Sequence, residues 1–588
     1  MRIADVLPLT PLQQGLLFLA NAAERDDDVY AVQLYVSLTG PLDPERLHAA
    51  VQAVVSRHPN LAARFSQKYA EPVQIILADP VVPWQYVELN ADGGDIEERI
   101  AELCVAERAA VCDLANQPAF RAALIRTAAD QHRLVLTNHH IVLDGWSLPI
   151  LLGEVFAGYY GQRLAPAAPY RRFVSWLSGR SLDAARAAWA EVLAGFDTPT
   201  LVGPTGRAER GHRDVASFAL SEQMTQDLHE LARTCHTTVS TVLQGAYALV
   251  LMSLTGQQDV AFGTTVSGRP DEVFGADSMV GLLINTVPVR VRITAITTVA
   301  SLLDQLQNDH AQTLEHQHLA LSEVHRVTGQ DRLFDTFFVY ENYPIDAAEL
   351  SGSDGLAVTD FAHHEYNHYP LGVQALPGDE LTLRVEYDTD VFDAADVKAL
   401  IERLEWVLAA MIADPALPLS KIDVLGDAEH TQLDQWSNRA ALTELVSSPE
   451  SIASMFAAQA LRTPDAMAVT FEGSSMTYRE LDEVATRAAN VLTTRGAGPG
   501  QRVALLLPRS AEAIVAMVAV VKTGATYVPI DPSVPESRRR FVLGDAEPIV
   551  VVTTAALAEQ SGGQSFSVID VSQQSSTNAC DGGIAASG

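Results

Sequence analysis

The stretch His-His-Ile-Val-Leu-Asp-Gly (HHIVLDG), residues 139–145, brings two imidazoles and a carboxylate close together in the chain. It follows residues 133–138 (RLVLTN), an apolar segment that is typical of a strand. Directly after it, Trp146 and Ser147 lead into residues 148–160 (LPILLGEVFAGYY), which predict a helix. The sequence therefore predicts a strand that ends at the histidines and a helix that begins just beyond the carboxylate.

The side chains of this stretch are suited to proton transfer. Imidazole titrates near neutral pH, so a histidine at a strand end can accept a proton. Asp144 can orient the ring or fix the backbone, and Gly145 permits close approach of a substrate. Because neighbouring strand residues point to opposite faces, only one of His139 and His140 can face a given cavity. The alternative to a role in proton transfer is that the histidines are buried in the core with their hydrogen bonds satisfied. A metal site is less favoured, because no further cluster lies at ligand spacing.

Composition and charge narrow the classes of function. The chain has 588 residues, of which 48% are hydrophobic, so three or four units of domain size are expected. Its net charge of −33 argues against nucleic acids and anionic membrane surfaces as partners. It has no apolar run long enough to span a bilayer, and its start lacks the pattern of a secretory signal. Its four cysteines show neither zinc spacing nor a disulfide framework, which favours a reducing cytoplasm.

Strands and helices alternate in the first region of the chain. Residues 32–38 (VQLYVSL) predict a strand. Asp43, which precedes a proline, predicts the N-cap of a helix that ends near Arg57. Residues 119–128 and 133–138 predict a hairpin, and its second strand delivers the histidines.

A joint is predicted at residues 165–169 and 180–186, and a second strand–helix region follows it. Residues 239–254 (VSTVLQGAYALVLMSL) are apolar on almost every face, which indicates a buried helix. Residues 259–265 predict a buried strand, and 267–270 (SGRP) predict a loop. Further strands are expected at 280–292, 334–343 and 381–387, and a helix at 393–413.

The pattern changes after this helix. Residues 414–450 are polar and irregular, which predicts a linker. From residue 451 on, helices and strands alternate in the manner of a parallel α/β sheet. Strands are expected at 468–471, 502–507 and 527–530, and helices at 478–495 and 511–523. The Ser/Gln/Gly-rich tail at 572–588 is expected to be disordered.

Several ordered motifs resemble those of the condensation domain of nonribosomal peptide synthetases. The resemblance covers roughly residues 5–425, and the number and order of the motifs make it far more specific than the histidines alone. The motifs lie at 8–18 (PLTPLQQGLLF), 57–65 (RHPNLAARF), 138–147 (NHHIVLDGWS), 262–270 (FGTTVSGRP), 281–290 (GLLINTVPVR) and 333–344 (LFDTFFVYENYP). Residues 476–481 (MTYREL) and 521–532 (VKTGATYVPIDP) then resemble the first two core motifs of an adenylation domain, which usually follows condensation in an elongation module.

The resemblance implies an α/β (α+β) fold of two chloramphenicol-acetyltransferase-like lobes in a V. The active site would lie at their junction, in a tunnel open at both faces, and a partial α/β subdomain of adenylation type would follow. The boundaries expected are 1–175 for the N-terminal lobe, 176–428 for the C-terminal lobe, 429–450 for the linker, 451–571 for the partial adenylation domain and 572–588 for the disordered tail.

The resemblance also implies the reaction and the partners. An upstream donor carrier protein would present an acyl or peptidyl thioester, and the downstream carrier of the same module would present the acceptor amine. The substrates would ride on the phosphopantetheine arms of these carriers, with no cofactor bound directly and no metal. The protein would be a cytoplasmic monomer that binds neither nucleic acid nor membrane. The opening motif at 8–18 is closer to domains that accept a D-configured donor.

Within the family's catalytic motif, His140 would be the catalytic imidazole. It would either take the ammonium proton or hold the amine and the tetrahedral intermediate, and the sequence leaves both roles open. His139 would point away from the tunnel and support the fold. The backbone N–H of Gly145 would face the developing oxyanion. Asp144 would be architectural, in an ion pair for which Arg269 is the first candidate and Arg57 the second.

A further set of residues would line the tunnel or support it: Arg269, Arg57, Asn285, Trp146 and Ser147. The second motif departs from the family, which usually has an arginine directly after its leucine, whereas this chain has Leu61-Ala62-Ala63-Arg64. The sequence therefore leaves open whether this chain forms the ion pair that the family's arginine makes, and whether Arg64 takes the place of that arginine. The alternative to a role at the tunnel is that Arg57 and Arg64 are solvated charges on the surface.

Two signals limit the function of the later region. Residues 562–565 (GGQS) look like a carrier attachment site, but a strand rather than a helix is expected after them. No Gly/Ser/Thr-rich phosphate loop with a lysine follows the second adenylation-like motif. Amino-acid activation is therefore not expected, and the chain is expected to be a fragment or a truncated product.

Other functions fit the same motifs less well. An epimerisation domain shares the two histidines, but it normally follows a carrier and is not followed by adenylation. A cyclisation domain would have aspartates in place of the histidines. A freestanding acyltransferase would use coenzyme A thioesters and lacks the appended adenylation start. A non-catalytic platform that recruits carriers or tailoring enzymes is the alternative from a different class, and the intact His140, Asp144 and Gly145 argue against it.

Overall fold

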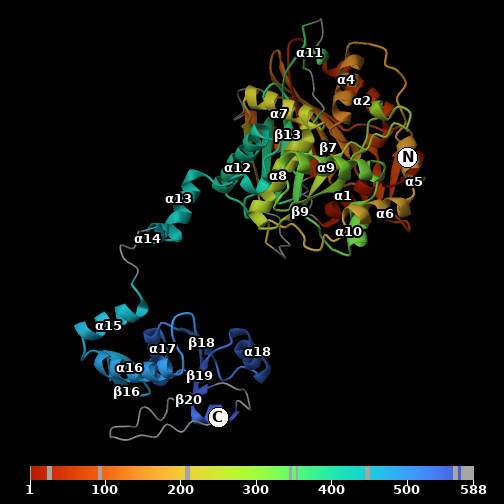
Figure 1. Ribbon diagram of the computed structural model, residues 1–588. Coiled ribbons are helices and arrows are strands. Elements are labelled where there is room, and N and C mark those ends of the chain that lie inside the picture. The colour runs from red at the N-terminus through yellow and green to blue at the C-terminus, as the bar shows by residue number, and fades with distance from the viewer. Residues whose placement is uncertain are drawn as a thin grey trace. The chain divides into compact units, whose positions relative to one another are not determined.

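The computed structural model divides the chain into two compact units, residues 1–433 and 434–588 (Figure 1). The residues that it describes are 2–22, 30–89, 96–204, 212–342, 347–351, 355–443, 450–560 and 567–570. The predicted tail at 572–588 and the carrier-like residues 562–565 lie outside the described residues.

The first lobe of unit 1 is built on a five-stranded sheet with the order β12-β2-β7-β6-β5. Its strands are β12 (Ala357–His364), β2 (Ala31–Thr39), β7 (Gln131–His139), β6 (Phe120–Ala128) and β5 (Trp84–Glu88). The strand predicted at 32–38 and the predicted hairpin are confirmed, since β6 and β7 pair antiparallel with Phe120 opposite Asn138. A three-stranded sheet, with the order β1-β4-β3, lies in the same lobe. Its strands are β1 (Ile3–Pro8), β4 (Val73–Leu77) and β3 (Arg64–Ser66).

Helices cover the larger sheet and complete the first core. α2 (Pro44–Arg57) begins at Asp43, whose carboxylate accepts hydrogen bonds from the backbone N–H groups of Glu45 and Arg46, as the N-cap prediction requires. α4 (Ser147–Tyr159) confirms the helix predicted after the histidine motif, and it packs against α2. α3 (Ile96–Val111) contacts β2, β6 and β7.

The second lobe is built on a six-stranded sheet with the order β10-β9-β11-β13-β14-β8. Its strands are β10 (Asn285–Arg292), β9 (Asp259–Val266), β11 (Thr336–Tyr340), β13 (Leu371–Leu376), β14 (Thr382–Asp388) and β8 (Arg213–Ala219). α8 (Val239–Thr255) is the predicted buried helix, and it packs with α9 (Val299–Thr313) and α12 (Ala394–Ala413). Within the described ranges no single helix can cross a membrane; α7 (Glu222–Thr234) and α8 pass by length and composition only as a pair bent by 102°.

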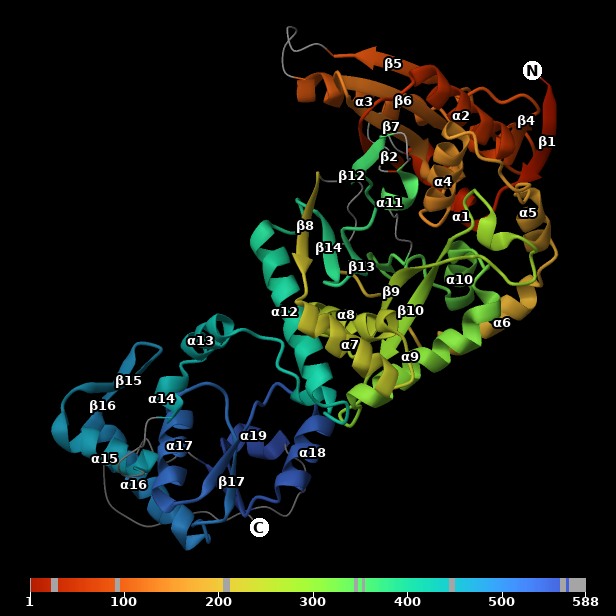
Figure 2. The same cartoon turned by 90° about the horizontal axis from the view of Figure 1, so that it is seen from above.

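Two segments of the later chain join the first lobe. β12 pairs antiparallel with β2, so it extends the sheet of the first lobe although it lies between strands of the second in sequence (Figure 2). The loop at 267–284 also packs into the first core, through Val273, Ala276, Met279, Val280, Leu282 and Leu283. The two lobes are therefore linked by exchanged segments as well as by the chain that runs between them.

The passage between the lobes is more helical than the sequence predicts. α5 (Arg171–Ser178) belongs to the first core through Phe173 and Val174. α6 (Leu182–Val192) packs in a different cluster, so the change from one core to the other falls within the predicted joint, although residues 182–186 of that joint are helical. The reason is local: Ser181 caps the helix, and the alanines that follow it favour helix.

The segment at 414–450, predicted to be irregular, contains α13 (Asp427–Trp436) and α14 (Arg439–Thr443). α13 has no buried residue among those described, so it lacks the apolar stripe by which an amphipathic helix is recognised. Acidic residues in its first turn, Asp427 and Glu429, stabilise it through the helix dipole.

Unit 2 contains the predicted parallel sheet. Its strand order is β18-β17-β19-β20, and all three pairings are parallel. The strands are β18 (Thr526–Ile530), β17 (Arg502–Leu506), β19 (Val550–Thr553) and β20 (Ser567–Asp570). The helices are α15 (Ile452–Arg462), α16 (Tyr478–Thr494), α17 (Ala511–Thr523), α18 (Glu536–Ala546) and α19 (Ala555–Gln560). A hairpin of β15 (Met467–Phe471) and β16 (Ser474–Thr477) precedes α16, and its second strand is an addition to the predicted elements.

The loop that links the lobes depends on Gly268. Its φ is +60°, and a Cβ atom there would lie 1.8 Å from the carbonyl oxygen of Leu283. We expect Gly268→Ala to destabilise the protein by at least about 2 kcal/mol more than Gly329→Ala. Gly329 is the matched control, because its φ is +71° and nothing lies within 4 Å of its added Cβ. Urea unfolding followed by tryptophan fluorescence measures both, and equal losses would contradict the expectation.

Candidate functional site

His140 and His139 point to different surroundings, as predicted for neighbours at a strand end. His139 ends β7 and is fully buried, and its Nδ1 accepts a hydrogen bond of 3.1 Å from the backbone N–H of Ile141. His140 begins a short 3-10 turn, and its backbone N–H donates to the carbonyl of Tyr30 at 2.8 Å. Its imidazole faces two cavities. The turn therefore directs one ring into the core and the other into open space.

The two cavities meet at His140. One has a volume of about 440 Å³ and the other of about 640 Å³. The larger is lined in part by α1 (Pro11–Ala22) and α10 (Leu321–Thr328), and the smaller by residues of β2, β12 and β14. The residues that line both are His140, Gly145, Glu341, Glu365 and Gln374. The imidazole predicted to be catalytic is thus accessible from either cavity.

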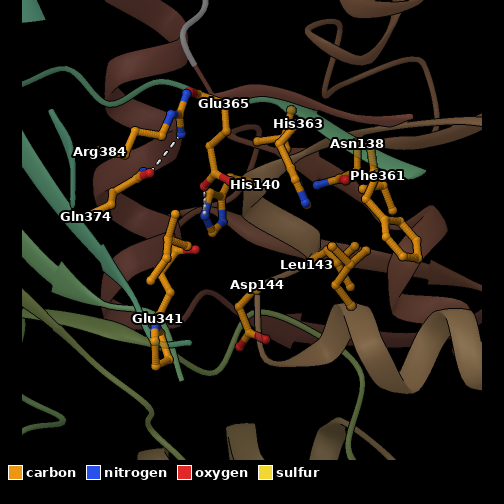
Figure 3. Close-up of a pocket in the computed structure, with 16 residues that line it drawn as sticks. Asn138, His140, Leu143, Asp144, Glu341, Phe361, His363, Glu365, Gln374 and Arg384 are labelled. Carbon is orange, nitrogen blue, oxygen red and sulfur yellow. Dashed lines mark hydrogen bonds and ion pairs between the residues drawn. The ribbon is translucent and has the colours of Figure 1, made fainter. Parts of the chain in front are cut away.

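Glu365 is the nearest charged group to this imidazole, and it is not among the residues predicted from the sequence. Its Oε1 lies 3.3 Å from Nε2 of His140, and Figure 3 shows the two side chains in contact. Burial by itself would lower the pKa of His140, but the hydrogen bond and charge of Glu365 outweigh it, so the pKa is raised. Burial likewise opposes ionisation of Glu365, yet the partnership with His140 lowers its pKa. When His140 is protonated, the two groups form an ion pair.

Strand register places Glu365 beside His140. β2 pairs on one side with β7, where Ala31 lies opposite His139. On its other side β2 pairs with β12, where Gln33 lies opposite His364. The next residue along each outer strand therefore emerges at the same edge of the sheet. The only sequence signal is the dense run of titratable and amide side chains at 363–368 (HHEYNH).

Asp144 is held by donors on both of its oxygens. Its Oδ1 accepts from the N–H of Ser147 at 2.8 Å and from the hydroxyl of Ser147 at 2.7 Å, and its Oδ2 accepts from the N–H of Leu283 at 2.8 Å. Oδ1 is also 3.2 Å from an Nη of Arg269, and both side chains are buried. Arg269, the first candidate partner, is therefore confirmed. These contacts tie the turn after β7 to the loop at 267–284, while the architectural role of Asp144 stays a prediction.

Arg57, the second candidate, does not contact Asp144 and lines neither cavity. It forms a two-point ion pair with Glu154 at 2.9 and 3.0 Å and donates to the carbonyl of Ala165 at 2.7 Å. Nε2 of His58 donates to the same carboxylate at 2.8 Å. Arg57 thus supports the packing of α2 on α4, and Arg64 is not among the described partners of Asp144.

The remaining predicted residues lie around the cavities. Trp146 and Asn285 line the larger cavity. The amide of Asn285 donates to the carbonyls of Gln317 and Leu319, at 2.7 and 2.8 Å, which connects β10 to the turn before α10. Ser147 is buried, and its hydroxyl oxygen also accepts from the backbone N–H of Gly281 at 3.1 Å. Gly145 lines both cavities, while its role toward an oxyanion stays a prediction. In the described ranges, no group of three or more His, Cys, Asp or Glu is placed to hold a metal.

We expect Asp144→Asn to destabilise the protein by about 3–5 kcal/mol, since it leaves the buried guanidinium of Arg269 without its counter-charge. The control is Asp183→Asn, whose carboxylate is 95% exposed in its pair with Arg186 and should matter by less than about 0.5 kcal/mol. Urea unfolding compares them. If Asp144→Asn were as stable as the control and yet inactive, the carboxylate would act in the chemistry and not in the scaffold.

The pair of Arg57 and Glu154 should make stability depend on pH. Burial would raise the pKa of Glu154, but hydrogen bonds from His58 and Arg57 dominate and hold it at about 2. The folded state therefore gains from this ionised carboxylate above the ordinary pKa, and loses the gain as the pH falls from about 4.5 to about 2. We expect the stability difference between wild type and Glu154→Gln to shrink over that range. Exposed Glu380, changed to Gln, should show no such trend.

Two known protein families match this chain, and their limits agree with the division into two compact units. The condensation-domain family matches residues 3–434, and the AMP-binding enzyme family matches residues 456–581. One of the linear gramicidin synthase proteins of Brevibacillus parabrevis is 32% identical over 95% of this chain, which spans 7% of that protein. Surfactin synthase subunit 3 from Bacillus subtilis is 32% identical over 95% of this chain, which spans 44% of that protein. This chain therefore corresponds to less than half of these relatives.

Solved structures give the same fold. The first condensation domain of the calcium-dependent antibiotic synthetase matches 72% of this chain and 100% of its own, with a TM-score of 0.60 and 21% identity. The nonribosomal peptide synthetase FmoA3 matches 98% of this chain and 60% of its own, with a TM-score of 0.71 and 22% identity. The predicted fold, a two-lobed condensation domain followed by a partial α/β subdomain, is confirmed. With a family match over most of its length, this chain belongs to the condensation-domain family of nonribosomal peptide synthetases.

Proposed function

We propose that residues 3–434 form a peptide bond between two carrier-bound substrates. One phosphopantetheine arm presents an acyl or peptidyl thioester, and the other presents an aminoacyl group whose amine is the nucleophile. The observation that carries the proposal is that the imidazole of His140 lines two cavities that meet there, so that one reactant in each cavity can reach the same group.

His140 would act where the amine attacks the thioester carbonyl. An imidazole at this point can take a proton from the attacking nitrogen or hold that nitrogen and the tetrahedral intermediate in place. The N–H of Gly145, at the junction of the cavities, would stabilise the negative oxygen of that intermediate. Holding the two tethered reactants together removes much of the entropic barrier. Trp146 and Asn285 would shape the larger cavity.

The finer features of partners and location are part of the same proposal. The donor carrier would lie upstream. The acceptor carrier would lie downstream, in the module to which this chain belongs, and the protein would work as a monomer. The net charge of −33 supports partners other than nucleic acids and anionic membranes. Cys104 and Cys235 form no disulfide bond, which supports the proposal of a reducing cytoplasm. The AMP-binding match covers only residues 456–581, and we assign no amino-acid activation to it.

We also propose the predicted domain limits: 1–175 and 176–428 for the lobes, 429–450 for the linker and 451–571 for the partial adenylation domain. Two observations support them. Val174 is buried in the hydrophobic core of the first lobe, whereas Ala185 is buried in a different hydrophobic cluster, so the boundary falls between these two residues. The two compact units divide after Leu433.

His140→Ala tests the proposed function in an assay with two loaded carriers. We expect the rate of peptide formation to fall by about 10²–10⁴-fold, because the imidazole no longer takes the proton or positions the amine. Binding of the carriers, measured by calorimetry, should persist. His48→Ala is the control, since that ring stacks on Trp84, 4.8 Å away, and lines neither cavity.

Two outcomes of this assay would contradict the proposal. Unchanged product formation by His140→Ala would indicate a platform that only brings carriers together. Inversion of the donor residue without amide formation, detected by chiral chromatography of the released product, would indicate an epimerisation domain.

A further inference from the structure

Glu365 reaches the site from the connection between β12 and β13, in a part of the chain that carries none of the condensation-domain motifs. We propose that Glu365 binds the ammonium group of the acceptor and holds it beside His140. The inference rests on the proposed function, since it names the group that receives one of the two substrates.

The geometry lets a cation bind both side chains at once from the side of the cavities. The carboxylate and the imidazole are 3.3 Å apart, and both line both cavities. An ammonium group has several N–H donors, so it can donate to the carboxylate and to the imidazole at once. Charge-assisted hydrogen bonds of this kind are shorter and stronger than neutral ones. The nitrogen that must attack is therefore oriented by the same contacts that bind it.

The charges around the pair also favour a cation. The titratable and charged groups that face it, taken from every packed element, are Tyr30, Asp144, Glu341, His363, Arg384 and Glu386. Arg384 donates to the side-chain oxygen of Gln374 at 2.7 Å (Figure 3). It also forms an ion pair with Glu386 at 3.0 Å. Asp144 is neutralised by Arg269. Glu365 and Glu341 are the carboxylates that line the shared part of the cavities, and they favour a positive ligand there.

The backbone around Glu365 is fixed in advance. Its carbonyl accepts a hydrogen bond from an Nη of Arg384 at 3.3 Å. Two residues on, the amide of Asn367 donates to Glu386 at 2.7 Å, and Gln374 donates to the same carboxylate at 3.2 Å. A binding side chain on a segment held by such bonds loses little entropy when its ligand arrives.

In this proposal the substrate ammonium replaces the imidazolium of His140 as the cation beside Glu365, and the proton balance of the reaction shows what this replacement does. The attacking nitrogen loses two protons as the amide forms: one goes to the departing thiolate and one goes to solvent. Before the acceptor arrives, the cation that faces Glu365 is the imidazolium of His140. When the ammonium takes that place, the imidazolium loses its counter-charge and releases its proton to solvent. His140 is then neutral and accepts the first proton of the ammonium, which it passes to the thiolate. The second proton of the nitrogen leaves to solvent as the amide forms. The amide is uncharged, so when it leaves Glu365 the imidazole of His140 takes back one proton from solvent, and the imidazolium faces Glu365 again.

NMR of the full chain labelled in its histidines tests the first part, with the His140 signal assigned by its loss in His140→Ala. We expect the pKa of His140 to fall by about one unit in Glu365→Gln, a tenfold change in proton affinity. Asp360→Asn is the matched control, because that carboxylate is exposed on the same strand, β12, and should leave the pKa unchanged. An unchanged pKa in Glu365→Gln would overturn the inference.

Binding of two small probes tests the second part. The probes are an amide analogue of glycyl-pantetheine and its hydroxyacetyl counterpart, which differ only in the ammonium. We expect Glu365→Gln to weaken the amine probe about tenfold or more and to leave the hydroxyl probe unchanged, with Glu365→Asp recovering part of the loss. Equal weakening of both probes would show a structural role and overturn the inference. Neither measurement requires turnover, so a failure of peptide formation would count against the proposed function alone.

Discussion

The buried ion pair between Asp144 and Arg269 is the interaction on which the site depends. Burying two charges is costly, and the cost is offset here because every oxygen of the carboxylate has a donor and the guanidinium also donates to the carbonyls of Ala276 and Met279. The bond joins the turn after β7 to the loop that arrives from the second lobe. His140 lies four residues before Asp144, so its position follows from that anchor.

The site is assembled from both lobes by exchanged segments. His140 comes from the first lobe, whereas Glu365 comes from the end of a strand that the later chain adds to the same sheet. Neither side chain is placed by its own helix or strand alone. Their contact depends on β2, which pairs with β7 on one edge and with β12 on the other. A single strand thus sets the distance between an acid and a base that are far apart in the sequence.

Much of the fold could be predicted, because long apolar or alternating segments carry it. The N-cap at Asp43, the buried α8 and the parallel sheet of unit 2 all follow from local patterns. α13 escapes prediction because it buries no apolar stripe. Glu365 escapes it because its contact with His140 depends on where β12 pairs, and the sequence of that strand, AVTDFAHH, contains no sign of its neighbour. The choice between Arg269 and Arg57 likewise depends on a tertiary contact, with α4 supplying the partner of Arg57.

The strand exchange has a mechanical consequence. A movement that pulled β12 away from β2 would break main-chain hydrogen bonds, and one that drew the 267–284 loop out of the first core would expose several apolar side chains. Both cost free energy, so these two contacts resist separation of the lobes on the side where the imidazole lies.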